Sequence, residues 1–244
     1  MSAAESIFYK ILNKVTEKNN LVRLTGILAV IGMFLLCVVD LKLLYMPLGS
    51  RKYSLFQAAL AHDRATIMAY SKLALFAIPL ILIGIYHIYL TLAIANKLLA
   101  RVVLAVFAFS YLNAAFYYAY LAYMMTSAQL VEPLKISLPH IVKHLYTLFQ
   151  MLYFFGIIAG SIFFFVALSF FKGKNYPRWY IFFNPLYMIL LFRMILPMAT
   201  PPAISGFLIT GSFNLIMLAT FALSTIFMWN RPIEKMWPEA PAQG

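Results

Sequence analysis

Six apolar stretches, each long enough to cross a membrane, constrain this chain more than any other feature. A helix needs about 20 apolar residues to cross the hydrocarbon core of a bilayer. Stretches of about this length lie at Leu24–Tyr45, Lys72–Ile94, Val102–Met125, Ile141–Phe171, Trp179–Thr200 and Ile204–Trp229. The sequence therefore predicts an all-α fold, a polytopic transmembrane helical bundle of about six spans.

The composition excludes a soluble domain of this length. Apolar residues make up 64% of the 244 residues, against roughly 45–50% in soluble domains. The net charge of +12 would suggest a nucleic-acid partner in a soluble protein, but the basic residues lie mostly between the apolar stretches. There they face anionic lipid headgroups, so we expect membrane lipids and no nucleic acid as partners.

The N-terminal residues 1–22 form a segment of a different kind. Between Ser6 and Asn19, apolar residues recur on one helical face and Lys10, Lys14 and Lys18 on the other, which predicts an amphipathic helix on the membrane surface. A tail packed on the bundle is an equal alternative. The expected organisation is this segment, a transmembrane domain over residues 23–230, and a cytoplasmic tail over residues 231–244.

The distribution of lysine and arginine gives the bundle a direction. One set of flanks carries eleven basic residues and the other carries five. Because cytoplasmic loops are enriched in lysine and arginine, we expect both termini in the cytoplasm of a cell (inner or plasma) membrane. The eleven are Lys10, Lys14, Lys18, Arg23, Lys97, Arg101, Lys172, Lys174, Arg178, Arg231 and Lys235, and the five are Arg51, Lys52, Arg64, Lys72 and Lys135.

Two ionisable residues lie inside the predicted spans at similar depth. Asp40 is in the outer half of the first span and Arg193 in the outer half of the fifth. Each would cost about 2.5–3.5 kcal/mol if unpaired in the membrane, so an Asp40–Arg193 ion pair is expected. The pair has two interpretations of equal weight, a ligand site or a link that only holds two helices together.

Three further residues extend this candidate ligand site. Asn113 and Tyr117 share a face of the third span, and Asn214 lies near the middle of the sixth. The asparagines have a plainer interpretation as interhelical hydrogen-bond donors. Taken together, an apolar wall with a few convergent polar groups is the general form of a ligand pocket, and this one would open away from the cytoplasm.

Histidines offer two sites for chemistry. His87 in the second span is the best candidate in the chain for handling a proton, although a buried histidine is more often simply hydrogen-bonded. His140 and His144 are four residues apart, so both imidazoles lie on one helical face, as a zinc pair requires. A zinc centre needs a third ligand, from Asp40 or His62, and no cofactor is otherwise expected.

Two local motifs bear on helix geometry. Gly156 and Gly160 form a G-x-x-x-G spacing that permits close helix approach, more typical here of internal packing than of dimerisation. Asn184-Pro185 and Pro197 predict a kinked fifth helix.

Several short motifs together resemble a family of uncharacterised prokaryotic multi-pass membrane proteins. They are Asn175-Tyr176-Pro177-Arg178-Trp179, Asn184-Pro185-Leu186, Asp40-Leu41, Tyr86-His87-Ile88-Tyr89, and the stretch from Pro202 through Gly206, Gly211 and Asn214 to Ala222-Leu223-Ser224-Thr225. The resemblance runs from about Arg23 to the last span and implies the architecture but no activity. In that family the position of Asn113 is often histidine, so the departure here puts any shared proton or metal chemistry in doubt.

Three functions remain open from the sequence. The preferred one is an integral membrane protein that binds a small amphipathic or lipid-like ligand, for transport or sensing, at Asp40, Arg193, Asn113, Tyr117 and Asn214. The first alternative is a membrane enzyme acting on a lipid through acid–base chemistry at His87 or metal-assisted chemistry at His140 and His144. The second is a structural or assembly subunit, and a homo-oligomer is left open.

Overall fold

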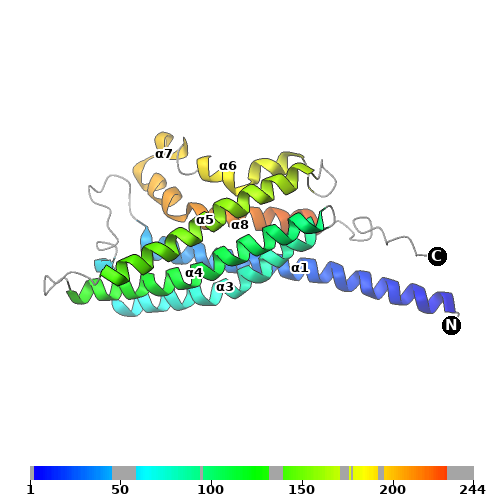
Figure 1. Ribbon diagram of the computed structural model, residues 1–244, viewed down its shortest axis with the longest axis horizontal. Coiled ribbons are helices and arrows are strands. Elements are labelled where there is room, and N and C mark those ends of the chain that lie inside the picture. The colour runs from blue at the N-terminus through cyan, green and yellow to red at the C-terminus, as the bar shows by residue number, and fades with distance from the viewer. Residues whose placement is uncertain are drawn as a thin grey trace.

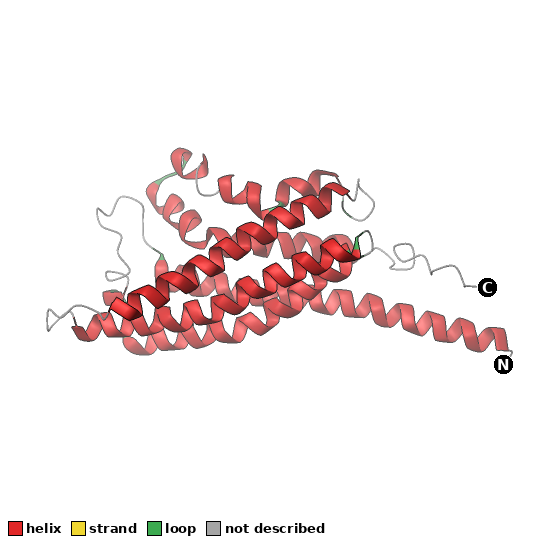
Figure 2. Ribbon diagram, viewed as in Figure 1, coloured by secondary structure: helices red, strands yellow, loops and turns green. Residues whose placement is uncertain are grey.

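The structure is a computed structural model that describes residues 3–45, 59–93, 96–131, 140–170, 176, 178–191 and 195–229. For residues 3–18, 131, 178 and 196–197 it describes the backbone alone. Every regular element among the described residues is a helix (Figure 2), so the predicted all-α class is confirmed.

Five long helices and three short ones make up the described fold. The long helices are α1 (Ala3–Leu44), α3 (Arg64–Leu92), α4 (Lys97–Val131), α5 (His140–Phe170) and α8 (Pro202–Trp229). The short ones are the 3-10 helix η1 (Arg178–Phe183), α6 (Pro185–Leu190) and α7 (Leu196–Ala199).

The long helices run alongside one another as a bundle (Figure 1). α1 packs against α3 and α8, and α4 packs between α3 and α5. The N-terminal part of α1 projects beyond the bundle (Figure 1), and its backbone continues without a break into the first apolar stretch. The amphipathic segment and the first span are therefore one helix rather than two elements joined at a bend.

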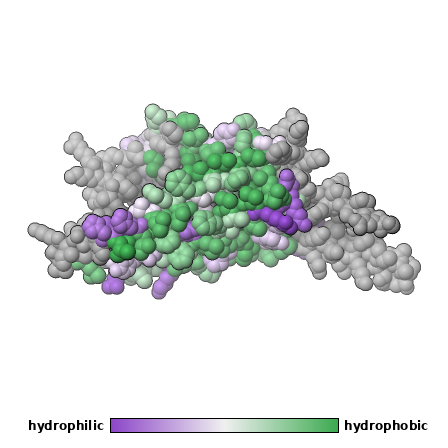
Figure 3. All heavy atoms as spheres, viewed as in Figure 1, coloured by the Kyte–Doolittle hydropathy of each residue, from purple (hydrophilic) through white to green (hydrophobic). Residues whose placement is uncertain are grey.

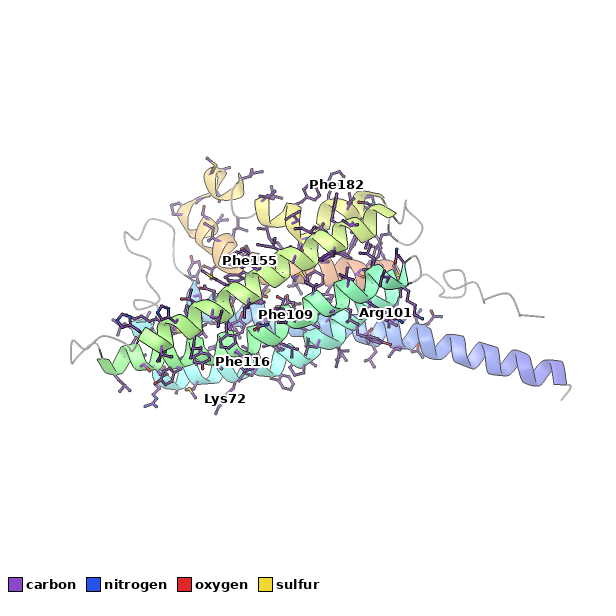
Figure 4. All side chains as sticks on the ribbon, in the orientation of Figure 1. Lys72, Arg101, Phe109, Phe116, Phe155 and Phe182 are labelled. Carbon is purple, nitrogen blue, oxygen red and sulfur yellow. The ribbon has the colours of Figure 1, made fainter. Side chains whose placement is uncertain are left out.

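The chain is a membrane protein. Five described segments are long and apolar enough to cross a bilayer: Asn19–Leu44, Arg64–Leu92, Lys97–Leu130, His140–Ser169 and Pro202–Trp229. Hydrophobic atoms dominate the middle of the visible face, and hydrophilic atoms gather toward its two ends (Figure 3). Phe109, Phe116 and Phe155 point outward from α4 and α5 (Figure 4) and are each more than half exposed, as lipid-facing side chains are.

The fifth predicted span differs from a continuous helix. Residues Trp179–Thr200 are divided among η1, α6 and α7, which lead from the end of α5 to the start of α8 (Figure 1). The break has a local cause, because the side chain of Asn184 accepts a hydrogen bond from the backbone N–H of Leu186 at 2.8 Å and so caps a new helix. Pro185 then occupies the first turn, where its missing N–H costs nothing.

Other helix ends are capped by side chains. Asp63 begins α3 by accepting hydrogen bonds from the backbone N–H and the hydroxyl of Thr66, and the backbone bond holds the pKa of its carboxyl below the usual value. At the opposite end of the bundle, Arg23 donates to the carbonyl of Trp229 at 2.8 Å and lies over its ring, which closes the C-terminal end of α8.

Glycines set the closest contacts between helices. A Cβ on Gly84 of α3 would lie 2.2 Å from the Cβ of Ala29 in α1. Cβ atoms on Gly156 and Gly160 would lie 2.6 Å from Ser110 and Phe107 of α4. The G-x-x-x-G pair therefore packs α5 against α4, which agrees with its prediction as internal packing.

Candidate functional site

The carboxyl group of Asp40 is the centre of a hydrogen-bonded cluster between three helices. Asp40 is buried one turn before the end of α1, at the end of the bundle opposite Arg23 and Trp229. Its Oδ1 accepts a hydrogen bond from the hydroxyl of Tyr118 in α4 at 2.7 Å, and its Oδ2 accepts one from Nδ2 of Asn214 in α8 at 2.7 Å. The sequence separations of 78 and 174 residues show that only the folded bundle assembles the cluster.

Two hydrogens of this cluster are donated to Asp40 and two join its neighbours to one another. Tyr153 of α5 donates to Oδ1 of Asn214 at 2.9 Å, and Nδ2 of Asn214 also lies 3.1 Å from the Tyr118 hydroxyl. The two tyrosines supply one hydrogen each and the asparagine amide supplies two, which matches the four contacts. The Asp40 cluster, defined as Asp40, Tyr118, Tyr153 and Asn214, is thus complete when the carboxyl group is ionised.

Aromatic rings surround the Asp40 cluster. The ring of Tyr117 lies 5.0 Å from that of Tyr118 and 5.9 Å from that of Tyr153, centroid to centroid. Phe154 packs beside Tyr153 and stacks on Phe213 at 4.5 Å. The faces of such rings carry partial negative charge and attract cations. Aromatic side chains therefore lie next to the buried carboxylate.

The structure brings together three of the five predicted ligand-binding residues. Asp40, Asn214 and Tyr117 lie in or beside the Asp40 cluster. Asn113 is buried elsewhere on α4 and donates to the carbonyl of Phe109 in its own helix at 2.8 Å, so it is not a member. Arg193 falls outside the described residues, and the Asp40–Arg193 ion pair stays a prediction.

His87 lies in a second cluster near the other end of the bundle. Its Nδ1 is 2.9 Å from the carbonyl oxygen of Val22 in α1, and its Nε2 is 3.0 Å from the hydroxyl of Ser224 in α8. Ser224 is 2.8 Å from the hydroxyl of Tyr176, which donates to Thr91 at 2.8 Å. The histidine is fully buried, only five residues before α3 ends, and so lies closer to the end of its span than to the middle.

The predicted zinc pair lies on the exposed surface at one end of the bundle. His140 and His144 begin α5 and are both exposed, as is Lys143 between them. No group of three or more His, Cys, Asp or Glu side chains suited to a metal ion occurs within the described part of the chain. The third ligand that a zinc centre requires is therefore not supplied by described residues, and zinc binding stays a prediction.

The sequence pattern did not single out Tyr118 and Tyr153 as partners of Asp40. Residues 111, 114, 118, 121 and 125 of α4 are all buried, and their spacing of three and four is a detectable signal that places Tyr118 on the inward face. Nothing comparable marks Tyr153 as the donor to Asn214, because that contact depends on how α5 is rotated against α8.

Comparison with known proteins yields a family and no relative of known activity. No curated protein matches the chain, and no solved structure matches it. A family of unknown function, DUF6796, matches residues 16–231. The match covers all five long apolar helices and both hydrogen-bonded clusters, and it agrees with the resemblance to an uncharacterised membrane family. This chain belongs to the family of unknown function DUF6796.

Proposed function

We propose that this protein binds a small amphipathic molecule within the membrane, and that the polar end of the ligand is a cationic group such as an ammonium that binds Asp40. One observation carries the proposal. Asp40 is the only acidic residue in the described membrane-spanning segments, and its described partners, Tyr118 and Asn214, are both neutral. A buried carboxylate whose described hydrogen-bond donors are all neutral favours a cation as its remaining partner.

The chemistry of the cluster supports a cationic headgroup. An ionised carboxylate offers about four lone-pair positions, and the described residues use one on each oxygen. An ammonium would form a charge-assisted hydrogen bond with the carboxylate and would gain from the faces of Tyr117 and the neighbouring rings. The apolar part of the ligand would lie along the same kind of surface that α4 and α5 present to lipid.

The direction of the site follows from the charge asymmetry. Asp40 lies near the end of α1 that leads into the sequence flanks with five basic residues, whereas the alternate flanks carry eleven. By the positive-inside rule, both termini lie in the cytoplasm of a cell membrane and the Asp40 cluster faces outward. A ligand that arrives from outside fits transport or sensing.

Binding of two probes that share an apolar chain tests the proposal. Decylammonium and decanoate are titrated by calorimetry into the full-length protein in neutral lipid nanodiscs. Binding of decylammonium is expected for the wild type and at least about tenfold weaker binding for Asp40→Asn, because the charge-assisted contact is lost. Decanoate is expected to bind neither protein above the level of nanodiscs alone.

The matched control is Asp63→Asn, which removes the same charge from an exposed residue at the same end of the bundle. It should leave decylammonium binding unchanged. If Asp40→Asn binds decylammonium as tightly as the wild type, the ammonium only partitions into lipid and the proposal fails. A structural or assembly subunit would then be the better interpretation.

A membrane enzyme acting on a lipid is the second candidate, because Nε2 of His87 is placed to accept the hydroxyl hydrogen of Ser224. This is the arrangement of a base beside a nucleophile. Both side chains are fully buried, so we place this candidate second. A fluorophosphonate probe tests it: a covalent adduct on Ser224, with loss of fluoride, would favour the enzyme, and unlabelled Ser224 would exclude a serine nucleophile.

A further inference from the structure

Five contacts in a row define the His87 network. In order, they join the Val22 carbonyl to His87, His87 to Ser224, Ser224 to Tyr176, Tyr176 to Thr91, and Thr91 to the carbonyl of Ile88. All five distances lie between 2.8 and 3.0 Å. The four side chains are at least nine-tenths buried, so water does not compete for these contacts.

A count of hydrogens shows that the network has one hydrogen fewer than it has contacts. Each contact needs one hydrogen, and both terminal groups are carbonyl oxygens that only accept. A neutral histidine supplies one hydrogen, and Ser224, Tyr176 and Thr91 supply one each, which makes four for five contacts. The deficit for these five contacts is one: a further donor to Tyr176 or Thr91 would bring its own hydrogen and leave it unchanged, and a further acceptor would enlarge it.

Protonation of the histidine removes the deficit. His87 must carry a hydrogen on Nδ1, because Val22 presents a carbonyl oxygen there. A second hydrogen on Nε2 would bond Ser224, whose own hydroxyl hydrogen could then turn to Tyr176. Each of the five contacts would then hold one hydrogen, with Tyr176 donating to Thr91 and Thr91 to Ile88.

We infer that the His87 network is a proton-binding site: His87 takes one proton from solution on Nε2, and Ser224 turns its hydroxyl from His87 to Tyr176. No other reactant is needed, and the network gains one positive charge. This inference does not depend on the Asp40 ligand, since the two clusters share no residue. Ser224 and Asn214 are ten residues apart on α8, which is about 15 Å along the helix.

The charged and titratable groups around the network are few. On α1, Arg23 follows Val22, but its guanidinium is bonded to the carbonyl of Trp229. Lys97 and Arg101 of α4 are exposed, and the ring of Tyr180 in η1 stacks on that of Tyr176. None of these described side chains is a carboxylate, so the completed hydrogen bonds are the local gain that acts against the cost of burying the charge.

Histidine protonation measured by nitrogen NMR tests the inference. Full-length protein with ¹⁵N-labelled histidine is titrated in nanodiscs from about pH 8 to about pH 4, a range that spans ordinary histidine titration. His62, His140 and His144 serve as internal references, and His87→Gln identifies the His87 signals. We expect His87 to become doubly protonated within this range in the wild type.

Thr91→Val is the decisive variant, because the network connects Thr91 to His87 through Tyr176 and Ser224. Removing the Thr91 hydroxyl takes away two of the five contacts and one hydrogen, so the deficit of the neutral network falls by one. The midpoint of His87 protonation should fall by about one pH unit, the effect of one hydrogen bond. Ser224→Ala also takes away two of the five contacts and one hydrogen, and it should lower the midpoint too.

Thr126→Val is the matched control, since the Thr126 hydroxyl, like that of Thr91, donates to a carbonyl of its own helix but lies outside the His87 network, in α4. It should leave the midpoint of His87 unchanged. Equal midpoints in the wild type, Thr91→Val and Ser224→Ala would overturn the inference. So would a wild-type His87 that stays singly protonated while the three reference histidines titrate.

Discussion

Two buried tyrosines on the same face of α4 differ in what their hydroxyl groups contact. Tyr118 donates to Asp40 at 2.7 Å, whereas the hydroxyl of Tyr111 lies near Tyr153 without reaching a hydrogen-bonding partner among the described residues. Tyr118→Phe should therefore lower the free energy of unfolding by about 1–3 kcal/mol, the range for a hydrogen bond to a charged group. Tyr111→Phe should change it by less than about 0.5 kcal/mol.

Unfolding of both variants by SDS titration measures the difference. In an Asp40→Asn background the effect of Tyr118→Phe should fall to less than half, because the acceptor is no longer charged. Equal effects of the two tyrosine substitutions, or an unchanged effect in the Asp40→Asn background, would show that Tyr118 stabilises the bundle by packing alone.

Residue-level prediction from sequence depends on side chains whose polarity conflicts with an apolar environment. An aspartate or asparagine in an apolar stretch is conspicuous, which is why Asp40 and Asn214 could be singled out as members of one site. The membership of Tyr153 could not be predicted in this way, because tyrosine is common in this chain and only the rotation of α5 selects which hydroxyl reaches Asn214. Asn113 was conspicuous for the same reason as Asn214, yet its amide is satisfied by its own helix.

At the scale of elements, α1 and α3 approach most closely at Gly84. A Cβ there would lie 2.2 Å from the Cβ and 2.8 Å from the Cα of Ala29, and the backbone of α1 cannot move aside cheaply. Gly84→Ala should destabilise the protein by about 1–3 kcal/mol. Gly211→Ala is the matched control, because its Cβ would meet only the flexible end of Leu215 at 3.0 Å.

The control variant should be neutral or stabilising by up to about 1 kcal/mol, since alanine favours a helix more than glycine does. Thermal unfolding in detergent compares the two variants directly. If Gly84→Ala unfolds at the wild-type temperature, α1 and α3 do not approach as closely as the structure places them.

Hydropathy predicts how long an apolar segment is better than it predicts whether that segment forms one continuous helix. Residues Trp179–Thr200 are apolar enough to be taken for one span. Their hydropathy alone does not reveal the break between helices. The signals of the break, Asn184 followed by Pro185, are present in the sequence and predicted a kink. Whether a kink becomes a new helix depends on a tertiary contact, here the hydrogen bond from Nδ2 of Asn184 to the carbonyl of Ser161 in α5 at 3.0 Å.

At the scale of the whole molecule, the short helices η1, α6 and α7 between α5 and α8 decide at which end of the bundle α8 finishes. Five long helices alone would place the start of α1 and the end of α8 at opposite ends. η1, α6 and α7 lead back along the bundle (Figure 1), so α8 ends at Trp229 beside Arg23 of α1. Arg23 and Trp229 therefore lie at the same end of the bundle, and the expectation that this end faces the cytoplasm stays a prediction.

Labelling of single cysteines in intact cells tests the direction of the whole bundle. Cys37, which is buried, is first replaced by alanine, and then Lys42→Cys or Lys97→Cys is introduced at exposed positions at opposite ends. A maleimide that cannot cross the membrane should label the protein carrying Lys42→Cys in intact cells, because this position lies at the end expected to face outward. The protein carrying Lys97→Cys should be labelled only after the membrane is permeabilised. The reverse pattern would turn the bundle over and place Asp40 toward the cytoplasm, whereas labelling of both proteins in intact cells would contradict a bundle whose ends lie on opposite sides of the membrane.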